Sequence, residues 1–570
     1  MVVSQPDVEL EAAEVENRTE DQIHENHTEE DPDSPEKDSP ENSTEKEETD
    51  RTTTKTTTKT ITKTTQTTET TTTAHDASES TADTTSTSSE STASTTTSTS
   101  TKPPGDLKML VITDLHFHPR YKRTLGPKCR CRTISPESRS CQVPAAPYGQ
   151  HGCNSPKRLI DLSLEAAKAQ EPELWLVLGD LVDHHVGQSP SKFKAPLYSK
   201  EKENEWGHRI FKKTLSWISA ASGRRCLVAV GNNDIFPGYT VDFEQEGFYE
   251  AVAQEVRRSC DLSENAFSTL RRFGFYWEEI GEKMVLLVLN TVIYATKLAN
   301  RHNSTAQDPF GQLAWLKRRL QAAQVQGYKV YIAGHIPPVA SSFQPYDLWQ
   351  RTFAVRYWNL LAKYGEVVAG QFFSHQHRDE FRVALEPRGD TPPPMQLFAS
   401  VSPVFGNNPS FYAVEIRERR LHEYRCFWAN LSEEEPKFAL EYEASSLVDN
   451  FTNVAYRDLA LNTTPAGQDR YNHYYSYMAV GARGTQNCDH ENTFWVNPVT
   501  CGTCIDGCQQ QVTCMLLYGI SVSTSQLRLG ALIGAGPLPP SERWRIRDHP
   551  TGGLSGRDAM DPVGMRWMAF

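Results

Sequence analysis

Seven side chains able to bind metal ions follow five short apolar runs of the sequence, each at the point where a run ends. They are Asp114, His116, Asp180, Asn232, His335, His375 and His377. Carboxylate, imidazole and amide donors in this mixture suit zinc, manganese or iron. Because a zinc ion takes about four protein ligands, the set predicts two divalent metal ions, with Zn as the first choice. Two such ions can hold a phosphoryl group and generate a hydroxide for in-line attack.

The spacing of these residues indicates how they could share one site. Side chains at the carboxyl ends of buried parallel strands converge on one crevice, where the sheet holds them rigid. Alternate residues in Asp114-x-His116 and His375-x-His377 can then point to the same side. A carboxylate such as Asp180 can bridge both ions.

The elements that must position these residues alternate along the chain from residue 107. Apolar runs predict strands over 107–113, 174–179, 226–231, 284–290, 329–334 and 367–373. Between them, helical patterns cover 156–170, 203–220, 312–326 and 353–364. This alternation predicts an α/β domain with largely buried strands.

The order of these motifs resembles that of the calcineurin-like metallophosphoesterases. Asp-x-His, Gly-Asp, Gly-Asn-x-Asp, Gly-His and His-x-His occur in sequence, and the surrounding residues narrow the resemblance. Motifs at 153–156, 308–313, 371–377 and 408–411 are similar to those of the acid sphingomyelinase-like phosphodiesterase branch, over about residues 107–430. The resemblance implies a metallophosphoesterase sandwich of two mixed sheets flanked by helices.

The resemblance also implies roles for single residues. One metal ion would be held by Asp114, His116, Asp180 and His377, and the other by Asp180, Asn232, His335 and His375, so that Asp180 bridges them. His184, four residues after Asp180, would be the general acid for the leaving oxygen, whereas the neighbouring His118 and His185 have no matched role. Asn233 stands where the family usually has a histidine that contacts the phosphate, and it can donate a hydrogen bond but not a proton. Ser374 stands where the family usually has glycine.

These features predict a dinuclear-metal-dependent phosphodiester hydrolase, sphingomyelin phosphodiesterase-like, acting by attack of a metal-bound hydroxide on phosphorus. No six-cysteine saposin-like segment precedes residue 107, which favours a substrate reachable from solution over sphingomyelin itself. One alternative is an endopolyphosphatase that cleaves phosphoanhydride bonds, since Gly231-Asn232-Asn233-Asp234 followed by Ile-Phe-Pro is similar to that family. Another is a non-catalytic secreted or surface glycoprotein that retains the fold.

Acidic and basic residues are distributed unevenly along the chain. Residues 1–104 contain 24 acidic and eight basic residues, and the rest contains 48 acidic and 51 basic residues, which argues against a strongly basic nucleic-acid-binding domain. We expect a disordered acidic and then Thr/Ser-rich tail over 1–104, because it has too few apolar residues to bury. The catalytic domain is predicted over 105–430, a Cys-rich C-terminal subdomain over 431–530, and a loose tail over 531–570.

The cysteines and glycosylation motifs bear on the compartment. All 12 cysteines lie beyond residue 128, and most of them fall in two clusters that predict disulfides. Cys226 and Cys260 lie outside the clusters and could be paired or free. Seven Asn-x-Ser/Thr motifs begin at Asn17, Asn26, Asn42, Asn303, Asn430, Asn450 and Asn462. No apolar run reaches the roughly 18 residues of a membrane span, and Met1–Glu20 lacks the apolar core of a secretory signal. We expect a secreted or lumenal protein, of a lysosome-like or vacuole-like kind, with a cytoplasmic protein as the alternative.

Overall fold

The computed structural model describes residues 105–132, 141–184, 186, 200–245, 247–299, 308–343, 346–384, 392–461 and 470. The predicted tails, the cysteines from Cys488 to Cys514, His185 and five of the seven glycosylation motifs lie outside these residues. The domain boundaries expected from the sequence remain predictions.

The first sheet has six strands in the order β12-β11-β10-β1-β2-β3. Strands β1, β2 and β3 run parallel, with Leu110 opposite Trp175 and Leu176 opposite Leu227, and the others pair antiparallel. From Met109 onward β1 is buried on both faces, as expected for a parallel strand covered on both sides. The bounds are β1 Leu107–Ile112, β2 Leu174–Val177, β3 Cys226–Val228, β10 Ser410–Arg417, β11 Arg420–Ala429 and β12 Phe438–Glu443.

The second sheet also has six strands, in the order β4-β5-β6-β7-β9-β8. Its central strands β5, β6, β7 and β9 are parallel, and β4 and β8 pair antiparallel at its two edges. All five residues of β5 are buried. The bounds are β4 Tyr276–Gly281, β5 Met284–Val288, β6 Lys329–Ala333, β7 Val368–Phe373, β8 Glu380–Arg382 and β9 Met395–Leu397.

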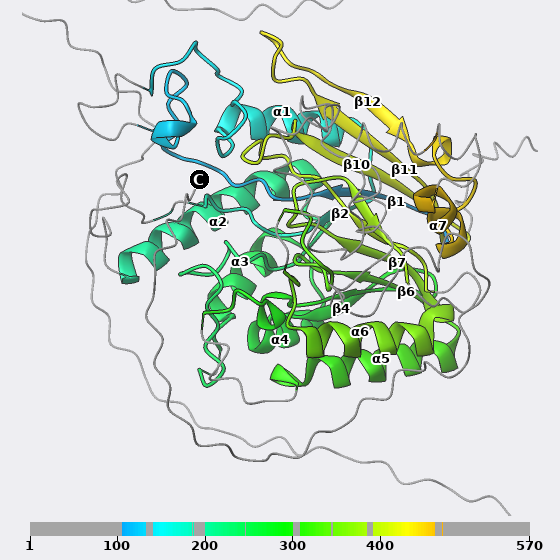
Figure 1. Ribbon diagram of the computed structural model, residues 1–570. Helices are drawn as coiled ribbons and strands as arrows, with labels where there is room; N and C mark the ends of the chain where they lie inside the picture. Colours follow the sequence, from blue (N-terminus) through cyan, green and yellow to red (C-terminus); the bar gives the residue numbers. More distant parts are fainter. Residues whose placement is uncertain are drawn as a thin grey trace, which may run out of the picture. The chain divides into compact units, whose positions relative to one another are not determined.

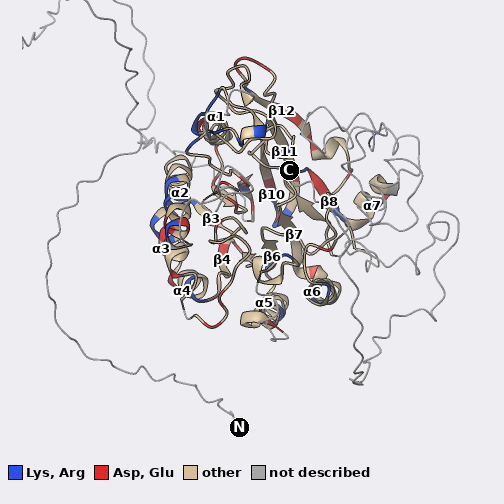
Figure 2. Cartoon of the chain, turned by 60° about the vertical axis from the view of Figure 1, so that its left-hand side comes forward, with Lys and Arg blue, Asp and Glu red and all other residues tan. Residues whose placement is uncertain are grey.

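Helices cover the outer faces of this pair of sheets. Helices α5 and α6 lie side by side next to the second sheet, and α1 lies near β10 of the first (Figure 1). Charged residues of both signs mark α2 and α3, whereas the strands in the middle of the second sheet carry few (Figure 2). The bounds are α1 Lys157–Lys168, α2 Lys200–Ser222, α3 Glu250–Ser259, α4 Glu264–Phe273, α5 Gln312–Gln326, α6 Arg351–Tyr364 and α7 Asn453–Leu461. The predicted fold of two mixed sheets flanked by helices is confirmed.

The described residues contain three disulfides, which join Cys129 to Cys141, Cys131 to Cys153 and Cys226 to Cys260. The last pair resolves the alternative that the sequence left open for Cys226 and Cys260. Cys426 is buried and free. Within the same residues, no helix has both the length and the apolar character needed to cross a membrane.

Candidate metal centre

The predicted ligands lie where the carboxyl ends of the parallel strands of the two sheets meet. Asp114 and Asp180 follow the parallel strands β1 and β2, and the amide of Asp114 donates to the carbonyl of Gly179 at 3.0 Å. His335 follows β6 in the second sheet, yet its Nδ1 donates to the carbonyl of Leu178 at the end of β2, at 2.7 Å. The site is therefore built at the junction of both sheets.

The backbone at this junction is unusual for the residue types that occupy it. Five of the predicted ligands have positive φ, a conformation that costs a residue other than glycine about 1 kcal/mol or more. They are Asp114 at 49°, His116 at 42°, Asp180 at 55°, His375 at 73° and His377 at 54°. Such conformations concentrate at functional sites, where the surrounding fold enforces them. Ser374 is not among the positive-φ residues, so the serine in place of the family's glycine needs no special backbone.

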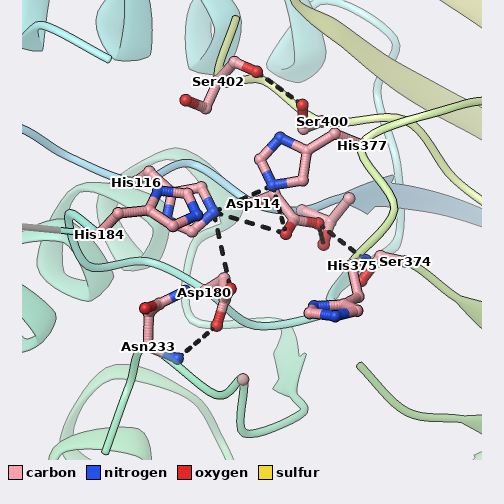
Figure 3. A network of polar contacts seen from close by, with 12 residues as sticks. Asp114, His116, Asp180, His184, Asn233, Ser374, His375, His377, Ser400 and Ser402 are labelled. Carbon is pink, nitrogen blue, oxygen red and sulfur yellow. Dashed lines mark hydrogen bonds and ion pairs between the residues drawn. The ribbon is translucent and has the colours of Figure 1, made fainter. Parts of the chain in front are cut away.

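One group of donors surrounds the buried carboxylate of Asp114. Its Oδ1 lies 3.2 Å from His377 Nε2 and 3.6 Å from His116 Nε2, and these two ring nitrogens are 3.2 Å apart. Asp180 Oδ2 lies 3.6 Å from His116 Nε2 and so joins the same group. These side chains point toward one another (Figure 3).

A second group shares Asp180. Its Oδ2 lies 3.2 Å from His335 Nε2, which is also 3.1 Å from Asn232 Oδ1 and 3.2 Å from His375 Nδ1. The donor atoms of Asp180, His335 and His375 all lie within 4.8 Å of one another, as do those of Asp114, His116 and Asp180. Asp180 is therefore common to two groups that could each hold a metal ion.

Hydrogen bonds on the far side of two rings fix which nitrogen faces the centre. His116 Nδ1 donates to the carbonyl of Val182 at 2.8 Å, as His335 Nδ1 does to that of Leu178. Each ring therefore presents the lone pair of Nε2 inward, which is the usual arrangement of a metal-binding histidine. Asp114 Oδ1 is buried and, among the described residues, receives no hydrogen bond of acceptable geometry despite the nearby imidazoles. These donors fit divalent metal ions.

The charges at the centre also call for a cation. Burial alone would raise the pKa of Asp114, but the imidazoles of His377 and His335 hold this pKa well below its usual value. Burial would lower the pKa of His335, yet the carboxylates of Asp180 and Asp114 raise it to about 9. For His375, burial and then His335 lower the pKa to about 3, which leaves its ring neutral. The negative charges of these two buried carboxylates must therefore be balanced, either by a proton on an imidazole or by a metal ion.

The two predicted catalytic residues flank this centre. Asn233 donates twice to Asp180, from its backbone amide to Oδ1 and from Nδ2 to Oδ2, both at 2.7 Å. The ring of His184 stacks on that of His116 with centroids 3.8 Å apart. Together with His377, these two histidines form a third group with ligand atoms within 4.8 Å of one another, which the sequence did not predict.

Two supporting residues had no role in the sequence-based prediction. The buried carboxylate of Asp234 accepts from the backbone amides of Asp180 and Leu181 at 2.8 Å and of Gly231 at 2.9 Å. Its place in the Gly-Asn-Asn-Asp motif was the only signal for it. Tyr239 Oη lies 3.3 Å from His375 Nε2, and nothing in the local sequence marks it.

Comparisons with known proteins agree with this geometry. The calcineurin-like phosphoesterase family matches residues 107–379, a range that includes all seven predicted ligands. The chain carries a calcineurin-like phosphoesterase domain. It is an enzyme domain of the metal-dependent hydrolase type, which favours the catalytic predictions over the non-catalytic glycoprotein.

The chain is similar to three curated relatives. It is 28% identical to the human acid sphingomyelinase-like phosphodiesterase 3b over 71% of this chain and 86% of that protein. It is 27% identical to the human cyclic GMP-AMP phosphodiesterase SMPDL3A over 68% of this chain and 86% of that protein. Identity to sphingomyelinase phosphodiesterase D of Dictyostelium discoideum is 29%, over 46% of this chain and 57% of that protein.

Proposed function

We propose that this chain hydrolyses phosphodiesters with two divalent metal ions bound where its two sheets meet. The observation that supports this most directly is the shared carboxylate. Asp180 Oδ2 lies within 3.6 Å of His116 Nε2 and 3.2 Å of His335 Nε2, so one side chain serves both donor groups. A single-ion site would have no use for a second complete group of donors.

Each ion would have its own ligands. Asp114, His116, Asp180 and His377 would hold one ion, and Asp180, Asn232, His335 and His375 would hold the other. Bound there, the ions would supply Lewis-acid activation of the phosphoryl group and of the attacking water. Zinc is the first choice for such imidazole-rich sets, although manganese and iron use similar donors.

The two flanking residues would handle protons and orientation. His184 would donate a proton to the leaving oxygen as the bond to phosphorus breaks. Asn233 would keep the Asp180 carboxylate in place through its two hydrogen bonds of 2.7 Å. Asparagine carries no charge, so it would contribute less to binding an anionic substrate than the family's usual histidine.

Metal content and turnover measured on one preparation test the proposal. We expect about two divalent ions per chain, together with hydrolysis of bis(4-nitrophenyl) phosphate that a chelator abolishes and added zinc or manganese restores. Asp180→Asn should lower both the bound metal and turnover, the latter by about 100-fold or more. A wild-type preparation that binds metal but hydrolyses no phosphodiester on a broad panel would contradict the proposal.

An endopolyphosphatase is the second candidate, favoured by Asn233. The same preparation should be assayed on long-chain polyphosphate, on a cyclic dinucleotide and on sphingomyelin in mixed micelles. If phosphodiesters are the substrates, Asn233→His should raise their turnover and leave polyphosphate unaffected. Polyphosphate cleavage that exceeds diester cleavage by wild type would select the alternative.

We further propose a secreted or lumenal location. Three disulfides among the described residues favour an oxidising compartment. At the exposed Asn450 the Thr452 hydroxyl donates to Asn450 Oδ1 at 2.5 Å, in a turn that leaves the acceptor amide at the surface. Expression in a secretory host should yield a glycosidase-sensitive shift in mass that Asn450→Gln reduces. Protein recovered only from the cytosol, with reduced thiols, would contradict the location.

A further inference from the structure

A chain of hydrogen bonds leads away from Nδ1 of His184. His184 Nδ1 lies 2.7 Å from Asn154 Oδ1, and Asn154 Nδ2 lies 2.5 Å from Asp183 Oδ1. The other carboxylate oxygen, Asp183 Oδ2, lies 2.6 Å from His118 Nδ1. His118, Asn154 and Asp183 are buried, with 3–4% of their surface exposed. We call these three residues the His184 relay.

The direction of each bond in the relay follows from chemistry. A carboxylate only accepts hydrogen bonds, so Asn154 must direct its Nδ2 donor toward Asp183. Its Oδ1 therefore faces His184 and accepts from Nδ1–H. His184 keeps the proton on Nδ1 in either charge state, so any proton that it gives to a substrate would come from Nε2.

The backbone around the relay holds it rigid. The amide of His118 donates to the carbonyl of Ser155 at 2.8 Å, and the amide of Ser155 donates to the carbonyl of His116 at 3.1 Å. Cys153, directly before Asn154, is bonded to Cys131. Helix α1 begins three residues after Asn154. Asn154 is thus fixed by covalent and hydrogen-bonded neighbours on both sides, which is the support that a precisely oriented catalytic group needs.

We infer that His118, Asp183 and Asn154 are positioning residues that hold His184 in the tautomer and orientation needed to protonate the leaving group. The inference rests on the proposed function, because it requires His184 to act as the general acid. As the bond from phosphorus to the leaving oxygen breaks, the proton on Nε2 moves to that oxygen, and His184 becomes the neutral ring with Nδ1–H still bonded to Asn154. The relay matters most for poor leaving groups such as alkoxides, which depart only when protonated.

Leaving-group dependence separates this role from a merely structural one. Two diesters with the same retained group should be compared, one releasing 4-nitrophenolate, which leaves readily without a proton, and one releasing an alkoxide. For Asn154→Leu, we expect kcat on the alkyl ester to fall by about 100-fold and kcat on the nitrophenyl ester by less than about threefold, since general acid catalysis contributes about 10² or more. KM and metal content should stay near the wild-type values.

A reciprocal exchange tests the direction of the hydrogen bonds. Asn154→Asp alone places two carboxylates next to each other, and Asp183→Asn alone leaves one acceptor oxygen for two donors, so each should impair alkyl-ester turnover. The double variant restores the chain, because the new carboxylate at position 154 would accept from His184 and from the new amide at position 183, whose oxygen would accept from His118. We expect turnover of the alkyl ester by the double variant to be at least about tenfold higher than by Asp183→Asn alone.

The outcomes separate the inference from the proposed function. Asn290→Leu is the matched control, since this buried asparagine also makes two side-chain hydrogen bonds, to Tyr249 Oη and the carbonyl of Phe273, and neither bond involves a predicted ligand. Equal losses on both esters for Asn154→Leu, or a loss of bound metal, would overturn the relay. If the wild-type protein hydrolysed neither ester, the proposed function would be refuted instead. If His184→Ala lost equal kcat on both esters, the role of His184 as general acid would be refuted.

Discussion

Gly231→Ala should damage the proposed metal centre without replacing any of the predicted ligands. Gly231 lies three residues after the end of β3 in the first sheet, beside the shared carboxylate. A Cβ at this position would lie 2.9 Å from Asp180 Cγ and closer still to its Oδ1 and backbone nitrogen, whereas ordinary contact begins near 3.4 Å. The two segments must therefore separate by about 0.5 Å or more at Cγ. A rotamer change of Asp180 cannot relieve the clash, because its backbone nitrogen is also involved.

The backbone cannot yield freely either. Asp234 Oδ2 accepts from the amides of both Asp180 and Gly231, at 2.8 and 2.9 Å, and so ties the two segments together. Displacing a catalytic group by about 1 Å can cost on the order of 100-fold in rate. We expect kcat of Gly231→Ala to fall by about 100-fold, equivalent to about 2.7 kcal/mol of transition-state stabilisation. Metal affinity should fall as well, because Asp180 serves both donor groups.

Turnover of a chromogenic diester over a range of metal concentrations, with bound metal measured in parallel, is the assay. Gly327→Ala is the matched control, because a Cβ there has nothing within 4 Å although φ is +71°. This control should lose about 1 kcal/mol of stability to backbone strain and keep full activity. If Gly231→Ala retained kcat within about threefold of wild type together with full metal content, the placement of Asp180 between the two donor groups would be wrong.

Three further predictions concern residues that support the site or the fold. Asp234→Asn should lower both the melting temperature and turnover. The carboxylate accepts from three backbone N–H groups through its two oxygens, whereas an amide has only one accepting oxygen, and each bond lost costs about 1–3 kcal/mol. Thermal unfolding that matches wild type would contradict this. Burial, with a further effect of Asp379, raises the pKa of Glu441 to about 8. Folding therefore favours its protonated form, and the stability that this proton supplies is lost as the pH rises from about 4.5 to about 8, by up to about 1.4 kcal/mol per pH unit. Glu441→Gln should accordingly become more stable relative to wild type across that range, and parallel pH profiles of the two melting temperatures would refute the assignment. Replacing Cys131 and Cys153 together by alanine opens a disulfide that spans 22 residues and should cost about 3 kcal/mol; unchanged denaturant unfolding would show that this bond adds nothing.

The convergence of the predicted ligands could be anticipated from sequence because each follows an apolar run. Strand ends are local features, and parallel strands bring their carboxyl ends to one edge, so spacing along the chain translates into proximity. The helix over 312–326 was predictable for a similar reason, since its apolar positions recur at helical intervals. Strands such as β11 were missed, because charged residues interrupt its apolar positions.

The residues that orient the predicted ligands could not be found in this way. Asp234 reaches the amide of Asp180 across 54 positions of the sequence, and Asn154 reaches His184 across 30. Such contacts arise only when separate strands and loops are packed together. Periodicity and local propensity describe the neighbours of a residue along the chain, and they carry no information about these partners.

The backbone of the ligands shows most clearly where local reasoning stops. Strand alternation predicted that Asp114 and His116 point to the same side, and they do converge, but both have positive φ rather than extended backbone. Glycine would adopt this conformation at little cost, yet it has no side chain to donate to a metal. The fold enforces the conformation through bonds such as those from the amides of Asp114 and His116 to the carbonyls of Gly179 and Asp180, each at 3.0 Å. Local preference is therefore overridden at the positions of the proposed metal ligands, and functional positions are where a sequence is expected to depart from the rules that specify its fold.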